Sequence, residues 1–168
     1  MILEFNGKRP KIDPTAFIAE SAMVIGEVEI GPESNIWFYS VVRADMNFIR
    51  IGSRVNIQDA CVLHIDKKLY PLLIEDEVVL GHRVVAHGCT IRRGALIGIG
   101  AILLNGSEIG EESIVGAGSV VTPGTVIPPK TLALGAPAKP VRPLHEKDLE
   151  MVRDTHQDYQ QLMKLYGR

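Results

Sequence analysis

Aromatic side chains are scarce in this chain of 168 residues, which contains one Trp, four Tyr and four Phe. Its two cysteines, Cys61 and Cys89, are too few for the disulfide framework of a small secreted domain. The formal net charge of -2 leaves no basic excess for binding nucleic acid or anionic membranes. No apolar run reaches the roughly 18 residues of a membrane span, and the first residues lack the pattern of a signal peptide. We therefore expect a cytoplasmic protein that binds neither nucleic acid nor a membrane.

Isoleucine and valine are abundant instead, with 18 Ile and 16 Val. These β-branched side chains fit the pleated surface of a strand better than they fit a helix. Sixteen glycines and ten prolines indicate many turns. The composition predicts short strands around a core of small aliphatic side chains.

An aliphatic residue recurs every sixth position, frequently followed by glycine, and the fourth residue after it is usually small. A period of six fits neither an α-helix nor a plain alternating strand, and it requires a turn in every repeat. Three such strands close a triangular coil of about 18 residues, and the coils stack at the strand spacing. The aliphatic positions are Ile18, Val24, Ile30, Ile36 and Val42, then Ile51, Ile57 and Leu63, then Ile74, Leu80 and Ala86, then Ile91, Ile97, Leu103, Ile109, Val115, Val121, Ile127 and Ala133.

The pattern resembles the left-handed parallel β-helix of the hexapeptide-repeat family, and the resemblance runs from about Ile12 to Ala133. It implies an all-β solenoid of about six to seven coils. We expect residues 1–143 to form this β-helix with an N-terminal cap and an exit segment. Residues 144–168 are expected to form an amphipathic C-terminal α-helix packed on the prism within a single domain, because apolar residues recur there at spacings of three and four. These residues are Leu149, Val152, His156, Tyr159, Met163 and Tyr166.

The period fails at three places, between residues 42 and 51, 63 and 74, and 86 and 91. Polar residues that a small-aliphatic solenoid does not need lie beside these breaks. If residues 66–72 are an excursion, counting faces places His64 and His87 on one face, about one strand spacing apart. Two imidazoles at that spacing can share a metal ion.

His82 lies on the preceding face, around a corner from this pair, and joins it only if a second subunit supplies it. Three histidines with an open fourth position allow a metal ion to ionise bound water near neutral pH. The alternative is that each histidine is ordinary solvated surface. The spacing of the histidines alone favours neither the metal site nor the solvated surface.

Four sequence motifs resemble, in order and spacing, those of the γ-class carbonic anhydrases and their close homologues. They are Val42-Arg43-Ala44-Asp45, Asn56-Ile57-Gln58-Asp59, His64, and Gly81-His82-Arg83-Val84-Val85-Ala86-His87-Gly88-Cys89. The resemblance implies a homotrimer with a metal ion, Zn²⁺ or alternatively Fe²⁺ or Co²⁺, at each subunit interface. His64 and His87 would ligate it from one subunit and His82 from the neighbour. The implied reaction is reversible hydration of carbon dioxide to bicarbonate by a metal-bound hydroxide.

The same resemblance assigns roles to six further residues. Arg43 and Asp59 would form an intersubunit ion pair beside the metal, supported by Asp45. Gln58 would hydrogen-bond the hydroxide or bicarbonate, Asn56 would shape the pocket, and Tyr159 would line it from the C-terminal helix. The alternative from the residues alone is that Arg43 and Asp45 are surface charges of a bulge, and that Asn56 and Gln58 are turn residues.

The chain also departs from the founding members, which carry Glu directly after the Arg-x-Asp motif and a Glu-bearing loop after the first ligand. Here Met46 and the short segment Asp66–Pro71 stand in those places, so rapid proton export is in doubt. Three other interpretations remain open: an acyltransferase, an acyl-CoA thioesterase, and a metal-binding or scaffold trimer with little turnover. Cys61 is expected to pack in the interior, and the resemblance gives Cys89 no role.

Overall fold

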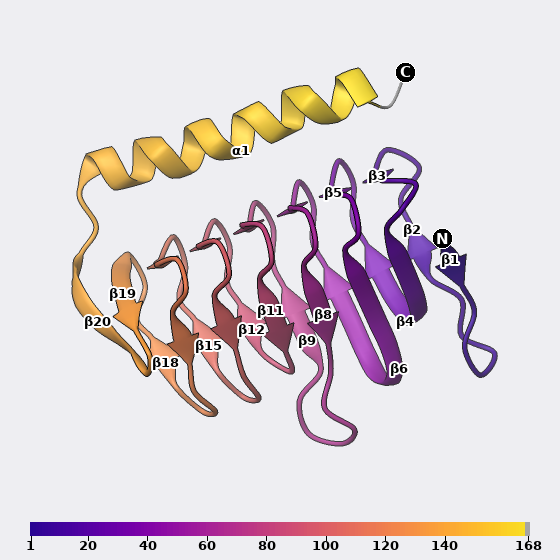
Figure 1. The fold of residues 1–168 in the computed structure, drawn as a ribbon, viewed down its shortest axis with the longest axis horizontal. Coiled ribbons are helices and arrows are strands. Elements are labelled where there is room, and N and C mark those ends of the chain that lie inside the picture. The colour runs from indigo at the N-terminus through magenta and orange to yellow at the C-terminus, as the bar shows by residue number, and fades with distance from the viewer. Residues whose placement is uncertain (167–168) are drawn as a thin grey trace.

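The structure is a computed structural model that describes residues 1–166. Short parallel strands coil into a prism, and one helix runs along the outside from the C-terminal end of the prism to its N-terminal end (Figure 1). The elements are β1 (Ile2–Leu3), β2 (Lys11–Ile12), β3 (Phe17–Ile18), β4 (Met23–Ile30), β5 (Asn35–Ile36), β6 (Val41–Ile51), β7 (Asn56–Ile57), β8 (Val62–His64), β9 (Leu72–Ile74), β10 (Val79–Leu80), β11 (Val85–His87), β12 (Thr90–Ile91), β13 (Leu96–Ile97), β14 (Ile102–Leu103), β15 (Glu108–Ile109), β16 (Ile114–Val115), β17 (Val120–Val121), β18 (Val126–Ile127), β19 (Thr131–Gly135), β20 (Ala138–Pro143) and α1 (Glu146–Tyr166).

The predicted aliphatic positions form the interior of the prism. From Ile36 to Ala133 these side chains are at most 4% exposed, and each pairs in register with its counterpart one coil away. Most of the small residues at the fourth position after them are buried as well, including Ser34, Ser40 and Cys61, whereas Thr125 and Thr131 are half-buried. A triangular interior this narrow has room only for branched and small side chains. The prediction of a parallel β-solenoid is confirmed.

The outward positions divide the prism into three unlike faces. The histidine face (β8, β11, β14, β17 and the first halves of β4 and β6) carries a column of apolar side chains: Met23, Val41, Val62, Val85, Ile102 and Val120. The charged face (β2, β9, β12, β15, β18 and the second halves of β4 and β6) carries Lys11, Glu29, Arg50, Leu73, Thr90, Glu108 and Val126. The helix face (β3, β5, β7, β10, β13, β16, β19) is contacted by α1 at β5, β7 and β10.

The three faults in the period take three structural forms. The first is the single long strand β6, which crosses from the histidine face to the charged face beside a register shift in β4. The second is a loop between β8 and β9 that projects from the prism in Figure 1. The third is a tight corner at Gly88, whose φ of 54° is the left-handed conformation that glycine tolerates best. All three lie next to the histidine face.

The C-terminal segment differs from the expected simple exit. β20 turns back and pairs antiparallel with β19, so a hairpin closes the end of the prism. The helix begins at Glu146 rather than at residue 144, because Asp148 accepts the main-chain N–H of His145 and pairs with Arg142 just before the first turn. The final two residues of the predicted helix, 167–168, lie outside the described residues.

The helix is held to the corner of the prism by polar side chains that reach main-chain carbonyls. His156 Nε2 lies 2.6 Å from the carbonyl oxygen of Arg54, and Gln160 Nε2 donates to that of Glu33 at 3.0 Å. Val152 and Met163 are the buried residues of the helix, as the amphipathic pattern predicts. Within residues 1–166, no helix is long and apolar enough to cross a membrane.

Candidate metal centre

His64 and His87 lie side by side on the histidine face. They end the adjacent strands β8 and β11 and are paired in register, as the repeat count predicts. His64 Nδ1 lies 3.1 Å from His87 Nε2, and the ring centroids are 5.1 Å apart. The excursion between β8 and β9 is what brings residues 23 positions apart onto one face in successive coils.

Each ring of the pair has an acceptor on its far side. Asp45 Oδ1 lies 3.0 Å from His64 Nε2, and Asn105 Oδ1 lies 2.5 Å from His87 Nδ1. Oxygen can only accept in these bonds, so each neutral ring carries its proton on the outer nitrogen. The facing nitrogens, His64 Nδ1 and His87 Nε2, therefore both present lone pairs with no proton between them. Two facing lone pairs repel each other unless a cation lies between them.

The spacing of these lone pairs fits a metal ion. Two nitrogens that each lie about 2.05 Å from a tetrahedral zinc ion are about 3.3 Å apart, close to the observed 3.1 Å. Among residues 1–166, no group of three or more His, Cys, Asp or Glu side chains converges on one point. Within these residues the two imidazoles are therefore not joined by a third such side chain.

Asp45 connects the pair to Arg43. Its Oδ2 bonds Arg43 Nη1 while its Oδ1 meets His64. Burial raises the pKa of Asp45, but the hydrogen bond from His64, a backbone hydrogen bond and the charge of Arg43 outweigh it and lower the pKa overall. The carboxylate stays ionised and holds both partners in place, so Asp45 and Arg43 are more than separate surface charges.

His82 lies apart from the pair, at the corner after β10, as the repeat count predicts. Its Nδ1 lies 2.9 Å from Asp59 Oδ2, and its Nε2 lies 3.3 Å from the hydroxyl of Tyr159 on α1. Burial and the Asp59 charge raise the pKa of Tyr159, so its hydroxyl keeps its proton and donates to His82. The His82 Nε2 lone pair thus accepts a hydrogen bond from Tyr159 within the same chain. Within one chain Asp59 pairs with His82, and the pairing of Arg43 with Asp59 across subunits stays a prediction.

Asn56 and Gln58 belong to a buried chain of amides on the helix face. Trp37 Nε1 donates to Asn35 Oδ1 at 2.7 Å, and Asn56 Nδ2 donates to the same oxygen at 2.5 Å. Gln58 Nε2 donates to Asn56 Oδ1 at 3.1 Å, and Gln58 Oε1 accepts the main-chain N–H of His82 at 3.2 Å. Both ends of the chain are obligate donors, which fixes every amide in one orientation. Asn56 lies in β7 rather than in a turn, so the turn interpretation is wrong for this residue.

Sequence reasoning missed Asn105, which lies in the turn after β14 and contacts His87. A signal was present, because 18 residues, one full coil, separate Asn105 from His87. Counting one coil on from His87 leads to Asn105, a polar residue in an otherwise aliphatic repeat.

The two cysteines lie inside the prism. Burial raises the pKa of the Cys61 and Cys89 thiols to about 12. Cys89 is 2% exposed, so it is a core residue. We predict that iodoacetamide at about pH 8 labels neither thiol in the native protein, because thiolate is scarce and reagent access is blocked. Mass spectrometry should count no adduct when native and two when denatured; labelling of Cys89 in the native state would contradict its burial.

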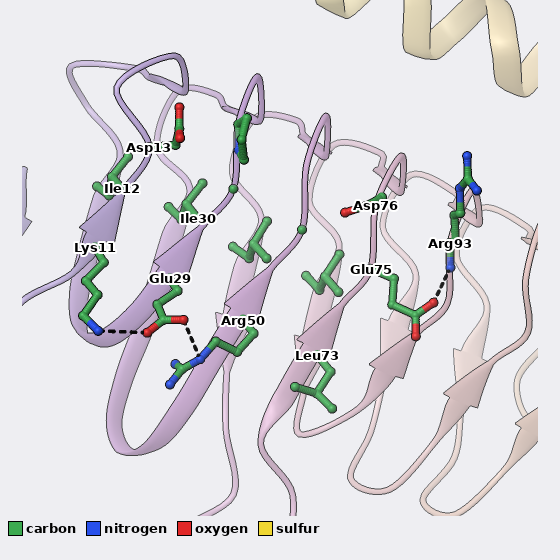
Figure 2. A pocket seen from close by; sticks show the side chains of 15 residues that line it. Lys11, Ile12, Asp13, Glu29, Ile30, Arg50, Leu73, Glu75, Asp76 and Arg93 are labelled. Atoms are coloured by element: carbon green, nitrogen blue, oxygen red, sulfur yellow. Dashed lines mark hydrogen bonds and ion pairs between the residues drawn. The ribbon is translucent and has the colours of Figure 1, made fainter.

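A hollow of about 880 Å³ opens elsewhere, on the charged face, and none of the three histidines lines it. Figure 2 shows Lys11, Glu29 and Arg50 joined by ion pairs along one rim, with isoleucines as the floor. Glu75 on the other rim accepts the main-chain N–H of Arg93. These charged groups satisfy one another, and the hollow is shallow and open. The histidines therefore remain the candidate site for chemistry.

Comparisons with known proteins agree with the geometry. A family model described as "Bacterial transferase hexapeptide (six repeats)" matches residues 88–123. A carbonic anhydrase of Geobacillus kaustophilus is 47% identical over 159 residues, which cover 95% of this chain and 87% of that protein. The chain belongs to the γ-class carbonic anhydrase-like family. Its fold is accordingly the left-handed parallel β-helix of hexapeptide repeats.

Other members of this γ-class carbonic anhydrase-like family carry transferase names. The uncharacterized transferase YtoA of Bacillus subtilis is 57% identical over 95% of this chain and 92% of its own. A solved hexapeptide transferase family protein from Anaplasma phagocytophilum is 33% identical, covers 99% of this chain and 98% of its own, and has a TM-score of 0.94. Membership of the family therefore leaves the reaction to be argued from the site.

Proposed function

We propose that this protein is a metal-dependent carbonic anhydrase that converts carbon dioxide and water reversibly to bicarbonate and a proton. The observation that carries the proposal is the pair of facing lone pairs on His64 and His87, 3.1 Å apart. Zn²⁺ suits two or three imidazoles in tetrahedral geometry, and Fe²⁺ or Co²⁺ are the alternatives. When bound, such an ion lowers the pKa of a water molecule towards neutrality.

The third ligand in this proposal is His82 of a second copy in a homotrimer. His82 cannot reach the pair in its own chain, yet its ring is fixed by Asp59, and its Nε2 would bind the metal ion of a neighbour in exchange for the hydrogen bond from Tyr159. The apolar column on the histidine face, with Val62 44% exposed, offers the surface on which a second copy would pack. Cyclic packing would place one complete site at each interface.

The remaining polar residues have roles that follow from their contacts. Gln58 is 5% exposed, and its Nε2 has a second N–H beyond the one given to Asn56, which can orient bicarbonate. Asn56 holds that amide in place. Arg43 has guanidinium donors beyond its bond to Asp45 with which to meet Asp59 of a neighbour. Tyr159 lines the approach beside His82.

Proton export is the weak step in this site. Met46, which is 48% exposed, holds the position after the Arg-x-Asp motif, and a side chain without a titrating group cannot carry protons. The loop after His64 is short and bears no glutamate. We therefore expect turnover that rises with the concentration of a small diffusible buffer, because external buffer can replace an internal proton carrier.

Because some relatives are named transferases, acyl transfer is the second candidate function. Thioester hydrolysis and a scaffold role are further candidates. A hexapeptide acyltransferase needs one histidine as a base. Such a base does not require a second imidazole. Here both His64 and His87 donate from their outer nitrogens to an acceptor, and the lone pairs of their inner nitrogens face each other. The convergence favours a metal.

The proposal is tested on full-length protein purified without chelator. We expect about one metal ion per chain by elemental analysis, and stopped-flow hydration of carbon dioxide above the buffer rate with Zn²⁺, Fe²⁺ or Co²⁺ loaded. Metal-free protein that cannot be loaded would overturn the proposal. A loaded protein that hydrates no carbon dioxide but binds coenzyme A or hydrolyses its thioesters would place it with the transferases or thioesterases, and one with neither activity would be a scaffold.

A further inference from the structure

Asn105 lies at the outer end of the histidine pair. Its Oδ1 is 2.5 Å from His87 Nδ1, and its own carbonyl accepts the N–H of Gly124 at 3.0 Å, which fixes the turn that carries it. The other end of the carboxamide faces the loop after β8. There Nδ2 donates to Asp66 Oδ2 at 3.4 Å.

The orientation of this carboxamide is determined by Asp66. Asp66 Oδ1 accepts the main-chain N–H groups of Lys68 and Leu69 at 3.0 Å each, which hold the carboxylate in place. An ionised carboxylate only accepts hydrogen bonds, so the NH₂ of Asn105 has to face Asp66 and its oxygen has to face His87. His87 Nδ1 must then be the donor in the bond between the two.

We propose that Asn105 is a positioning residue that selects the His87 tautomer able to bind metal. The other tautomer would donate Nε2–H to His64 Nδ1, 3.1 Å away, so that His87 Nε2 would have no lone pair and that of His64 Nδ1 would be engaged. With Asn105 in place, His87 keeps its proton on Nδ1 and its Nε2 lone pair faces His64. The inference rests on the proposed metal site and adds the residue that keeps the site open.

The first test measures the tautomer without any metal. Long-range ¹H–¹⁵N NMR of chelator-treated protein at about pH 8, above the ordinary histidine range, should show His87 protonated on Nδ1. Asn105→Leu should shift His87 to the Nε2–H form or to a mixture. The exchanged pair Asn105→Asp with Asp66→Asn keeps an acceptor facing His87 and a donor between positions 105 and 66, and should preserve Nδ1–H. Wild-type protein with His87 in the Nε2–H form, or an Asn105→Leu variant with an unchanged tautomer, would overturn the inference.

The second test measures affinity for Zn²⁺ by competition with a chelator. Loss of an acceptor behind a ligating histidine typically weakens metal binding by about 10–100-fold, which is expected for Asn105→Leu and not for the exchanged pair Asn105→Asp with Asp66→Asn. Asn47→Leu is the matched control, because Asn47 Nδ2 donates to the carbonyl of Asp66 at 3.2 Å and so anchors the same loop without this contact to His87. Equal weakening in Asn47→Leu would assign the effect to the loop and overturn the role of Asn105. If the wild type binds no metal, the proposed function is wrong. The NMR measurement of the His87 tautomer still tests the role of Asn105 in that case.

Discussion

Mixing His82→Ala chains with His87→Ala chains is expected to restore metal binding that neither variant has alone. Each variant lacks one half of the proposed site, because His64 and His87 come from one subunit and His82 from the next. In a trimer of both variants, an interface formed by the His64–His87 side of one and the His82 side of the other is intact. In every mixed cyclic trimer, whichever variant is present twice, about one third of the interfaces are complete.

The measurement is metal content of mixed oligomers, co-expressed with two different affinity tags and purified through both. A mixture of His64→Ala with His87→Ala chains is the matched control, since both substitutions damage the same half of the site and no interface regains it. Wild-type metal content in pure His82→Ala protein would show that His82 is not a ligand. Metal-free mixed oligomers would show that the site does not span two subunits.

The architecture could be predicted from the sequence because the same packing constraint applies in every repeat. A narrow triangular interior accepts only small or branched side chains, so Leu63, Ala86 and Leu103 mark one inner column by spacing alone. The excursion after Leu63 could be recognised as an insertion because the six-residue period resumed at Ile74, eleven residues later. From that count, the stacking of His64 on His87 and the separation of His82 followed without a structure.

Features that depend on hydrogen-bond direction could not be predicted in the same way. The period places Asn105 one coil from His87, but only the contact with Asp66 shows which end of the amide faces the ring. The amide chain from Trp37 to Gln58 likewise depends on which atoms are donors at its two ends. The β19–β20 hairpin was missed because its residues leave the period, and its pairing is antiparallel where all the repeats are parallel.

Val62→Lys is expected to convert the oligomer to monomers and to remove bound metal with it. Val62 is exposed in the middle of the apolar column, between Val41 and Val85 in the neighbouring coils. An ammonium group placed there would have to lose its hydration on association and would find no acidic side chain in the column. Because the proposed site needs His82 from a second copy, loss of association should lower metal affinity by far more than tenfold. Light scattering and chelator competition measure the two effects on the same sample.

Val126→Lys is the matched control for this substitution. Val126 is also outward-facing and 62% exposed, but it lies on the charged face opposite Glu108, where a lysine has a cross-strand partner. The control should remain a trimer with full metal content, and circular dichroism should show both variants folded, since neither side chain belongs to the interior. Dissociation of the trimer by Val126→Lys, or a metal-loaded trimer formed by Val62→Lys, would show that the subunit interface does not lie on the histidine face.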